Sequence, residues 1–139
     1  MDLARIEVSQ MTESMLNWCA AIAIGHQPAI RPTKNGFEIV IEDWVRNDSV
    51  VKEPLFSPTD NDGHCGILID RYCLATCKPN PLLDGFDENE IDPDCIWACV
   101  SYDGTVCTHG PDRKIAAVRN VIMAELGDWV EVPLQLVEK

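Results

Sequence analysis

Two segments of the chain carry the hydrophobic spacing of amphipathic helices. From a cap at Ser9 or Thr12 to about Ile24, apolar residues recur at the i, i+3, i+4 and i+7 positions of one helix face, and Gly25 follows. The same spacing returns after Gly110 and Pro111, where a proline suits the first helical position, and a second glycine ends the pattern. The second pattern predicts a helix over 111–126 whose buried face holds Ile115, Val118, Ile122 and Leu126.

Shorter apolar runs between these helices are typical of strands. Their residues are rich in β-branched side chains and are bounded by turn residues such as Asn35-Gly36 and Asp103-Gly104. Residues 67–69 fit either the end of a short helix or a strand, and a tail holding Val130, Val132 and Leu134 is expected to pack back onto the domain. The predicted strands cover residues 4–8, 37–41, 72–77 and 96–102.

This order of elements predicts an α+β fold. We expect a small single domain over residues 1–139, in which a short, mostly antiparallel sheet of three to four strands packs with two or three helices. A length of 139 residues fits one domain, and 46% hydrophobic residues suffice for a packed core. The longest apolar run, residues 18–24, is far below the ~20 residues that span a membrane. Because the first residues also lack a signal-peptide pattern, we expect a cytoplasmic protein.

The charge balance narrows the choice of partners. The chain has 11 Lys and Arg against 23 Asp and Glu, a net charge of −12, which repels nucleic-acid phosphates and anionic membranes. We therefore expect no direct binding to nucleic acid or membrane. The acidic surface is either simply solvated or occupies a basic surface of a protein partner. A loop at about 78–94 concentrates this charge without one basic residue between its acids, Asp84, Asp87, Glu88, Glu90, Asp92 and Asp94.

Seven cysteines, an odd number, indicate free thiols in a reducing compartment. Cys73 and Cys77, like Cys95 and Cys99, are spaced four apart within predicted strands rather than around the tight turn of a zinc knuckle. We therefore expect reduced, mostly buried thiols and no metal. The histidines and cysteines at 64, 65, 107 and 109 keep a zinc site open as an alternative.

The chain contains no known catalytic motif. There is no G-x-S-x-G, no Walker loop, no H-E-x-x-H and no zinc-deaminase signature. A protein that binds without catalysing, and without a cofactor, is therefore expected. The alternative is a small nucleotide-processing enzyme that uses a metal held by Asp60, Asp62 and His64.

Three segments together resemble the NinX-like family of small proteins of tailed phages and prophages. The segments are residues 16–25 (Leu-Asn-Trp-Cys-Ala onward), residues 56–69 (Phe-Ser-Pro-Thr-Asp to Gly-Ile-Leu-Ile) and residues 110–133 (Gly-Pro to Leu-Gly-Asp-Trp-Val-Glu-Val-Pro). The match covers most of the chain and is strongest at its end, while Asn17, Phe56 and Asn61 depart from the family pattern and the acidic loop resembles an insertion. The resemblance implies a phage accessory protein and supplies no mechanism.

Small phage accessory proteins often counter host defences by binding alone. The sequence therefore suggests a protein that sequesters a small nucleotide-like ligand. Trp18 or Trp97 would stack on a base, and Arg113 or Arg119 would hold a phosphate. Hydrogen bonds would come from the loop residues Ser57, Thr59 and Asp60. The same loop residues also fit a plain turn with a helix cap. If the protein does not bind a nucleotide, the alternative partner is a host defence protein. The sequence also leaves a homo-oligomer open.

Overall fold

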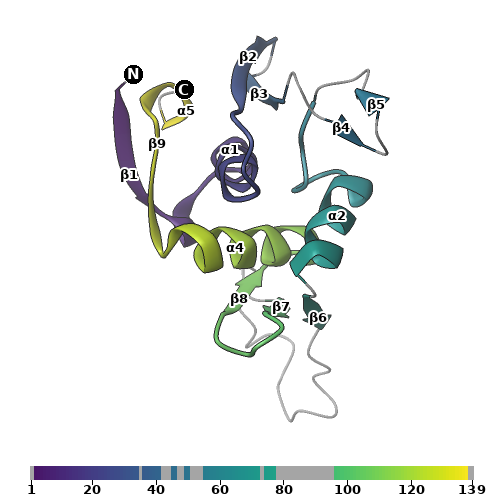
Figure 1. The fold of residues 1–139 in the computed structure, drawn as a ribbon. Coiled ribbons are helices and arrows are strands. Elements are labelled where there is room, and N and C mark those ends of the chain that lie inside the picture. Colours follow the sequence, from purple (N-terminus) through teal and green to yellow (C-terminus); the bar gives the residue numbers. More distant parts are fainter. Residues whose placement is uncertain are drawn as a thin grey trace.

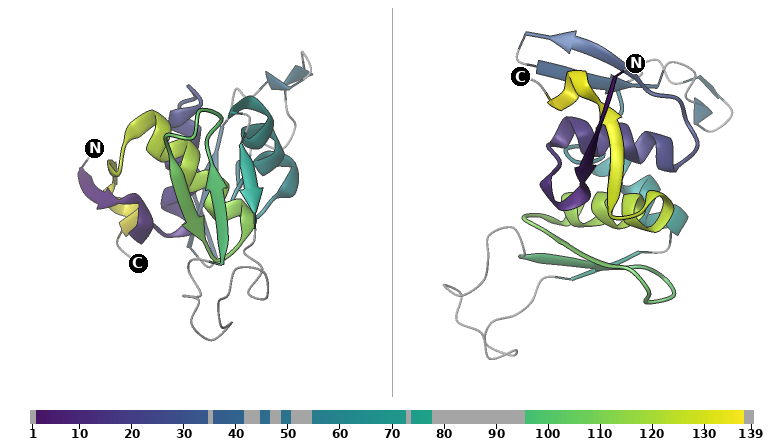
Figure 2. Two further views of the ribbon diagram at one scale, coloured as in Figure 1. Left: turned by 90° about the horizontal axis from the view of Figure 1, so that it is seen from below. Right: turned by 90° about the vertical axis from the view of Figure 1, so that its left-hand side faces the viewer.

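Helix α4 (Arg113–Leu126) lies at the centre of the molecule, and most other elements pack around it (Figure 1). The structure is a computed structural model that describes residues 2–34, 36–41, 45–46, 49–50, 55–72, 74–77 and 96–137. Helices α1 (Glu13–Ala23) and α2 (Asp62–Tyr72) contact one side of α4, and a three-stranded sheet covers the other side (Figure 2). The predicted α+β class is confirmed.

Local signals explain helices α1 and α4. The Asp112 side chain accepts a hydrogen bond from the Ile115 N–H at 2.8 Å, so α4 begins at Arg113 rather than at the expected proline. Thr12 caps α1 in the same way, through Met15 at 3.5 Å. Gly25 and Gly127 follow the two helices with φ of 92° and 95°, in the left-handed region that favours glycine.

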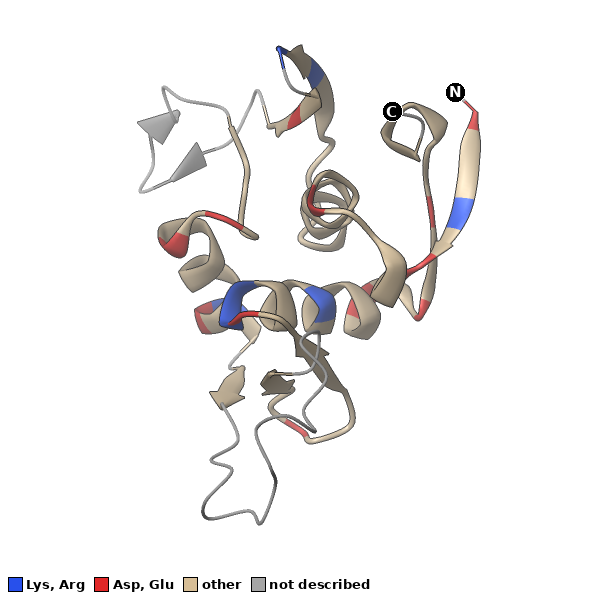
Figure 3. Ribbon diagram, turned by 180° about the vertical axis from the view of Figure 1, so that it is seen from behind, with Lys and Arg blue, Asp and Glu red and all other residues tan. Residues whose placement is uncertain are grey.

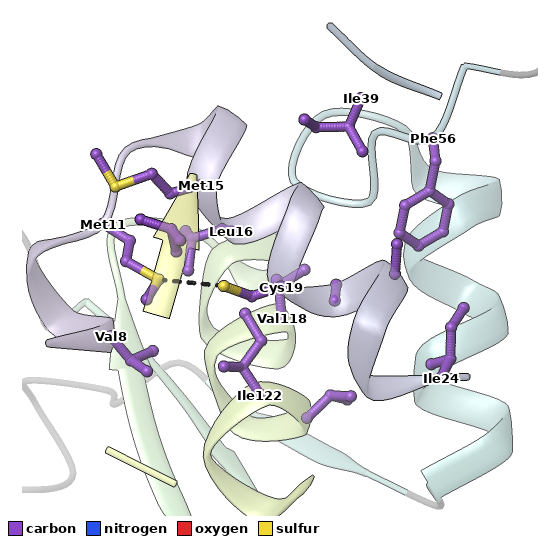
Figure 4. Packing of buried hydrophobic residues seen from close by; sticks show 14 of the residues in the cluster. Val8, Met11, Met15, Leu16, Cys19, Ile24, Ile39, Phe56, Val118 and Ile122 are labelled. Carbon is purple, nitrogen blue, oxygen red and sulfur yellow. Dashed lines mark hydrogen bonds between the residues drawn. The ribbon is translucent and has the colours of Figure 1, made fainter. Parts of the chain in front are cut away.

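The main core lies between α1 and α4. Leu16 and Cys19 of α1 pack with Val118 and Ile122 of α4, and all four are at most 1% exposed (Figure 4). The Cys19 thiol lies 3.8 Å from the Met11 sulfur inside this core. Ile115 and Leu126, also expected on the buried face of α4, are only partly buried at its border.

The sheet below α4 is antiparallel, in the order β6 (Ala75–Cys77), β7 (Trp97–Val100), β8 (Cys107–Gly110). Cys99 of β7 faces Thr108 of β8 in the register, and both are buried, whereas Cys107 and His109 are exposed. This alternation places one face of the sheet against the helices. The 96–102 prediction is confirmed over its central residues.

The predicted strand over 72–77 begins later than expected, and its first residue is helical. Helix α2 continues through Tyr72, and the strand begins only at Ala75. The ambiguous residues 67–69 are helical, and Leu68 is fully buried in the main core. Contact with α4 therefore decides in favour of the helix, where the local pattern alone could not.

The remaining strands form separate antiparallel pairs rather than joining one larger sheet. The predicted N-terminal strand pairs with the tail, which returns to the domain as expected but continues as a short helix from Leu134. The pairs are β1 (Leu3–Glu7) with β9 (Trp129–Pro133), β2 (Ala29–Thr33) with β3 (Gly36–Val40), and β4 (Val45–Arg46) with β5 (Ser49–Val50); η1 (Val8–Gln10) and α5 (Leu134–Val137) complete the elements.

The acidic loop at 78–94, with Asp84, Asp87, Glu88, Glu90, Asp92 and Asp94, lies outside the described residues, as do Cys73 and Cys95. In the part of the chain that the structure covers, every helix is too short or too polar to cross a bilayer. Charged residues in this part are spread over several elements, including the start of α1, β3 and α4 (Figure 3).

Candidate functional site

The loop that leads into α2 is anchored to β3 at its first residues. Leu55 forms a bridge with Val40, and the Phe56 N–H donates to the Ile39 carbonyl at 2.8 Å. Phe56 itself is fully buried, so its ring fixes the loop to the core. The Ser57 carbonyl then accepts from the N–H groups of the next turn, at Asp60 and Asn61. The turn that was the alternative interpretation of these residues is therefore present.

Asn17 connects this loop to α1. Its side-chain oxygen accepts from the Thr59 N–H at 3.2 Å, and its side-chain nitrogen lies 3.4 Å from the Ser57 hydroxyl oxygen. Asn17 is only 7% exposed, on a helix whose buried side is otherwise apolar. A buried amide in such a place is stabilised by hydrogen bonds that satisfy both of its ends.

His64, in the first turn of α2, supports the loop from the other side. Its Nδ1 accepts a hydrogen bond from the Ser57 N–H at 3.0 Å, and its ring stacks on Phe56 with 5.9 Å between ring centroids. An accepting Nδ1 carries no proton in this arrangement. The imidazole therefore acts here as a fixed support for the loop backbone.

A cavity of about 270 Å³ opens between α1, β3 and this loop. Thr59, which is 2% exposed, is among its lining residues, and the Thr59 hydroxyl oxygen has no hydrogen-bond partner among the described residues. A buried hydroxyl without a partner costs on the order of 1–3 kcal/mol. The lining residues are Glu13, Ser14, Asn17, Phe37, Glu38, Ile39, Leu55, Phe56, Ser57, Thr59 and Asp60.

The charge at this cavity is negative. Glu13, Glu38 and Asp60 contribute carboxylates, and no lysine or arginine lies among the described lining residues. Glu38 is paired with Arg31 of the neighbouring strand at 2.6 Å, which offsets one of the three charges. Glu13 and Asp60 are exposed and remain at the rim.

The structure brings together only part of the predicted ligand site. Ser57, Thr59 and Asp60 all line the cavity, whereas Trp18 is not among its lining residues and packs against the main core. Trp97 lies elsewhere, packed against a separate small cluster of Cys65, Cys99, Ala116 and Ala117. The expected stacking residues and hydrogen-bonding residues thus belong to different places in the fold.

The two predicted phosphate-binding arginines also lie outside this cavity. Arg119 is 8% exposed and donates to the His109 carbonyl at 2.7 Å and to the Ser9 carbonyl at 3.4 Å. It therefore joins α4 to β8 and to η1. Arg113 is exposed at the first residue of α4.

Asn17, Phe37 and Glu38 are cavity residues that sequence reasoning missed. One signal for Asn17 was present, since a polar residue occupies the spacing of a buried helix face, three and four residues before Ala20 and Ala21. Phe37 and Glu38 gave no such signal, because only the packing of the β2–β3 pair beside α1 places them here.

The described cysteines and histidines form no metal site. No group of three or more His, Cys, Asp or Glu side chains in the described ranges could hold a metal ion. Asp62 is instead bonded to Lys114 at 3.0 Å, and this hydrogen bond lowers the pKa of the Asp62 carboxyl. It joins α2 to α4, and Asp60, Asp62 and His64, the metal ligands of the alternative enzyme hypothesis, do not form a group that could hold an ion.

The described cysteines are free thiols, as expected, and three of the five are buried. Burial raises the pKa of Cys19 and Cys99 to about 12 and that of Cys65 to about 11. Cys77 and Cys107 are exposed. The buried thiols behave as small apolar side chains. This agrees with the expectation of reduced, mostly buried cysteines.

Comparisons with known proteins add no family assignment. Neither a scan against protein-family models nor a search of curated proteins gave a match to this chain. The resemblance to NinX-like phage proteins therefore stays a prediction that rests on the three segments quoted above.

Proposed function

We propose that this protein is a non-enzymatic binding protein that captures a small nucleotide-like ligand in the cavity between α1, β3 and the 55–60 loop. The observation that carries this proposal is at Thr59, a residue of the cavity lining whose buried hydroxyl has no partner among the described residues. A ligand that hydrogen-bonds to this hydroxyl recovers the cost of its burial. Phe37, which is half-buried, supplies aromatic surface in the same cavity.

The size of the cavity suits one small group. Pockets for drug-sized ligands span roughly 300–1,000 Å³, so about 270 Å³ corresponds to a base or a nucleoside fragment rather than to a dinucleotide. Larger parts of a nucleotide would extend past the exposed rim residues Glu13 and Asp60.

Binding rather than catalysis agrees with how the polar groups are used. Both ends of the Asn17 amide and the His64 Nδ1 already hold the loop, so they serve the shape of the cavity. The resemblance to NinX-like proteins suggests a phage accessory protein. Such a protein would act in host cytoplasm by sequestering a small signalling molecule of a host defence system. The alternative function is inhibition of a host protein, in which the acidic surface of this chain covers a basic surface of that protein. The acidic loop at 78–94 that would take part lies outside the described residues.

Native mass spectrometry of the protein taken directly from expressing cells tests this function. We expect a mass excess equal to one small ligand per chain, and we expect that excess to be lost in the variant Thr59→Val. The contrary result is a chain that carries no small ligand and co-purifies with a host protein, which it releases when the acids of the 84–94 loop are neutralised. That result would favour inhibition of a host protein over ligand capture.

A further inference from the structure

The polar groups at the cavity are mainly hydrogen-bond acceptors. The Glu13, Glu38 and Asp60 carboxylates only accept at neutral pH, and the Thr59 backbone N–H is already donated to Asn17. The Asn17 amide nitrogen is directed to the Ser57 hydroxyl. The Ser57 and Thr59 hydroxyls can donate as well as accept, but the three carboxylates cannot, so a ligand that contacts the carboxylates must bring donors of its own.

The same set opposes a phosphate. Phosphate recognition in proteins relies on arginine, lysine or free backbone N–H groups, and the described cavity lining contains neither arginine nor lysine. The nearby Arg31 is engaged with Glu38 through its Nε at 2.9 Å and through a second nitrogen at 2.6 Å. The two rim carboxylates of Glu13 and Asp60 would repel an anion that approached the opening.

We propose that the cavity selects an amino-bearing nucleobase, such as cytosine or adenine, and excludes phosphate from the cavity. Of the two N–H groups of the exocyclic amino group, one donates to a rim carboxylate and the other to the Thr59 hydroxyl oxygen, and the flat ring lies against the aromatic surface of Phe37. Uracil presents a carbonyl oxygen at the position of the cytosine amino group, and the rim carboxylates have no proton to donate to that oxygen. This inference rests on the proposed function and names the part of the ligand that enters.

Calorimetric titration of the full chain with cytidine, uridine and cytidine 5′-monophosphate tests the inference. We expect cytidine to bind at least about tenfold more tightly than either of the other two, because a site built to pair with an amino group rejects an analogue that lacks it. Adenosine against inosine repeats the comparison with a larger base that carries or lacks the amino group.

The variant Asp60→Asn gives a second readout. An amide in place of the rim carboxylate removes one negative charge and supplies a donor, so the preference for cytidine over its monophosphate should narrow by about threefold or more. Glu131→Gln, on the exposed side of β9 and outside the cavity, is the matched control and should leave the preference unchanged.

The possible results test the selection of the base separately from the proposed ligand capture. Equal or tighter binding of the monophosphate would overturn the exclusion of phosphate while ligand capture stands, and equal binding of uridine would overturn the selection of the amino group. If none of these nucleosides or nucleotides binds at millimolar concentration, the proposed function itself fails.

Discussion

The side-chain oxygen of Asn17 accepts a hydrogen bond from the backbone N–H of Thr59 at 3.2 Å. This bond links α1 to the loop before α2 across 42 positions of sequence, and it fixes the backbone beside the unpaired Thr59 hydroxyl. The candidate site is therefore held by a buried polar contact between two elements that are distant in the chain.

Replacing Asn17 by alanine should destabilise the protein by about 1–3 kcal/mol, because the Thr59 N–H would be buried without an acceptor. Urea denaturation measures the change. The control Ser57→Ala removes only the 3.4 Å contact to the other end of the amide and should cost about 0.5 kcal/mol or less. Equal losses in the two variants would show that the Thr59 N–H does not depend on Asn17.

Thr59→Val should raise the free energy of unfolding by about 1 kcal/mol, because valine keeps the shape of threonine and removes the buried unpaired oxygen. Thr59→Ser, which keeps the hydroxyl and loses a buried methyl group, should lower it by about 1 kcal/mol. Thermal unfolding of both variants without ligand gives the comparison. A destabilised valine variant would mean that the hydroxyl is already satisfied in the free protein.

Arg119→Lys should destabilise the fold by about 1–3 kcal/mol, since one ammonium group cannot replace a guanidinium that reaches carbonyls on both His109 and Ser9. Affinity for ligand should change little once the variant is folded, because Arg119 is not a lining residue of the cavity. Arg113→Lys, on the exposed start of the same helix, is the control for stability. A folded Arg119→Lys variant that loses tenfold in affinity would place the phosphate at Arg119 after all.

Stability should fall as pH rises above about 9. The pKa of Cys19 is raised to about 12 by burial, so in this range the unfolded chain loses the thiol proton and the folded chain keeps it. The stabilising effect is complete below the unfolded pKa, and each pH unit above it costs about 1.4 kcal/mol for each such thiol. Denaturation of the wild type and of Cys19→Ala between pH 8 and 10 should give a shallower decline in the variant; identical slopes would contradict the burial of this thiol.

The sequence predicts helices α1 and α4 and three of the four expected strands, but it does not predict helix α2. The caps at Thr12 and Asp112 and the glycines after each helix are local signals, so α1 and α4 lie close to their expected positions. The error at 72–77 has a tertiary cause, because α2 gains its last residues from packing that the local pattern does not encode.

In the candidate site, too, local features could be predicted and tertiary contacts could not. The loop residues Ser57 and Thr59 are neighbours in sequence, so their common location could be predicted. Trp97 and Arg119 could not be placed, because which side of the central helix each one meets depends on the assembly of distant elements. Asn17 enters the site through a contact that only the folded chain creates.

Chemical-shift mapping of isotope-labelled protein during titration with cytidine, adenosine and uridine tests ligand capture most directly. Binding at the cavity should move the backbone amide signals of Asn17, Ser57 and Thr59 most, in a saturable manner for at least one nucleoside. Signals from the sheet around Trp97 should stay in place, because that residue lies in a separate cluster. Largest shifts around Trp97 and Arg119, or no saturable shift at all, would contradict capture at this cavity.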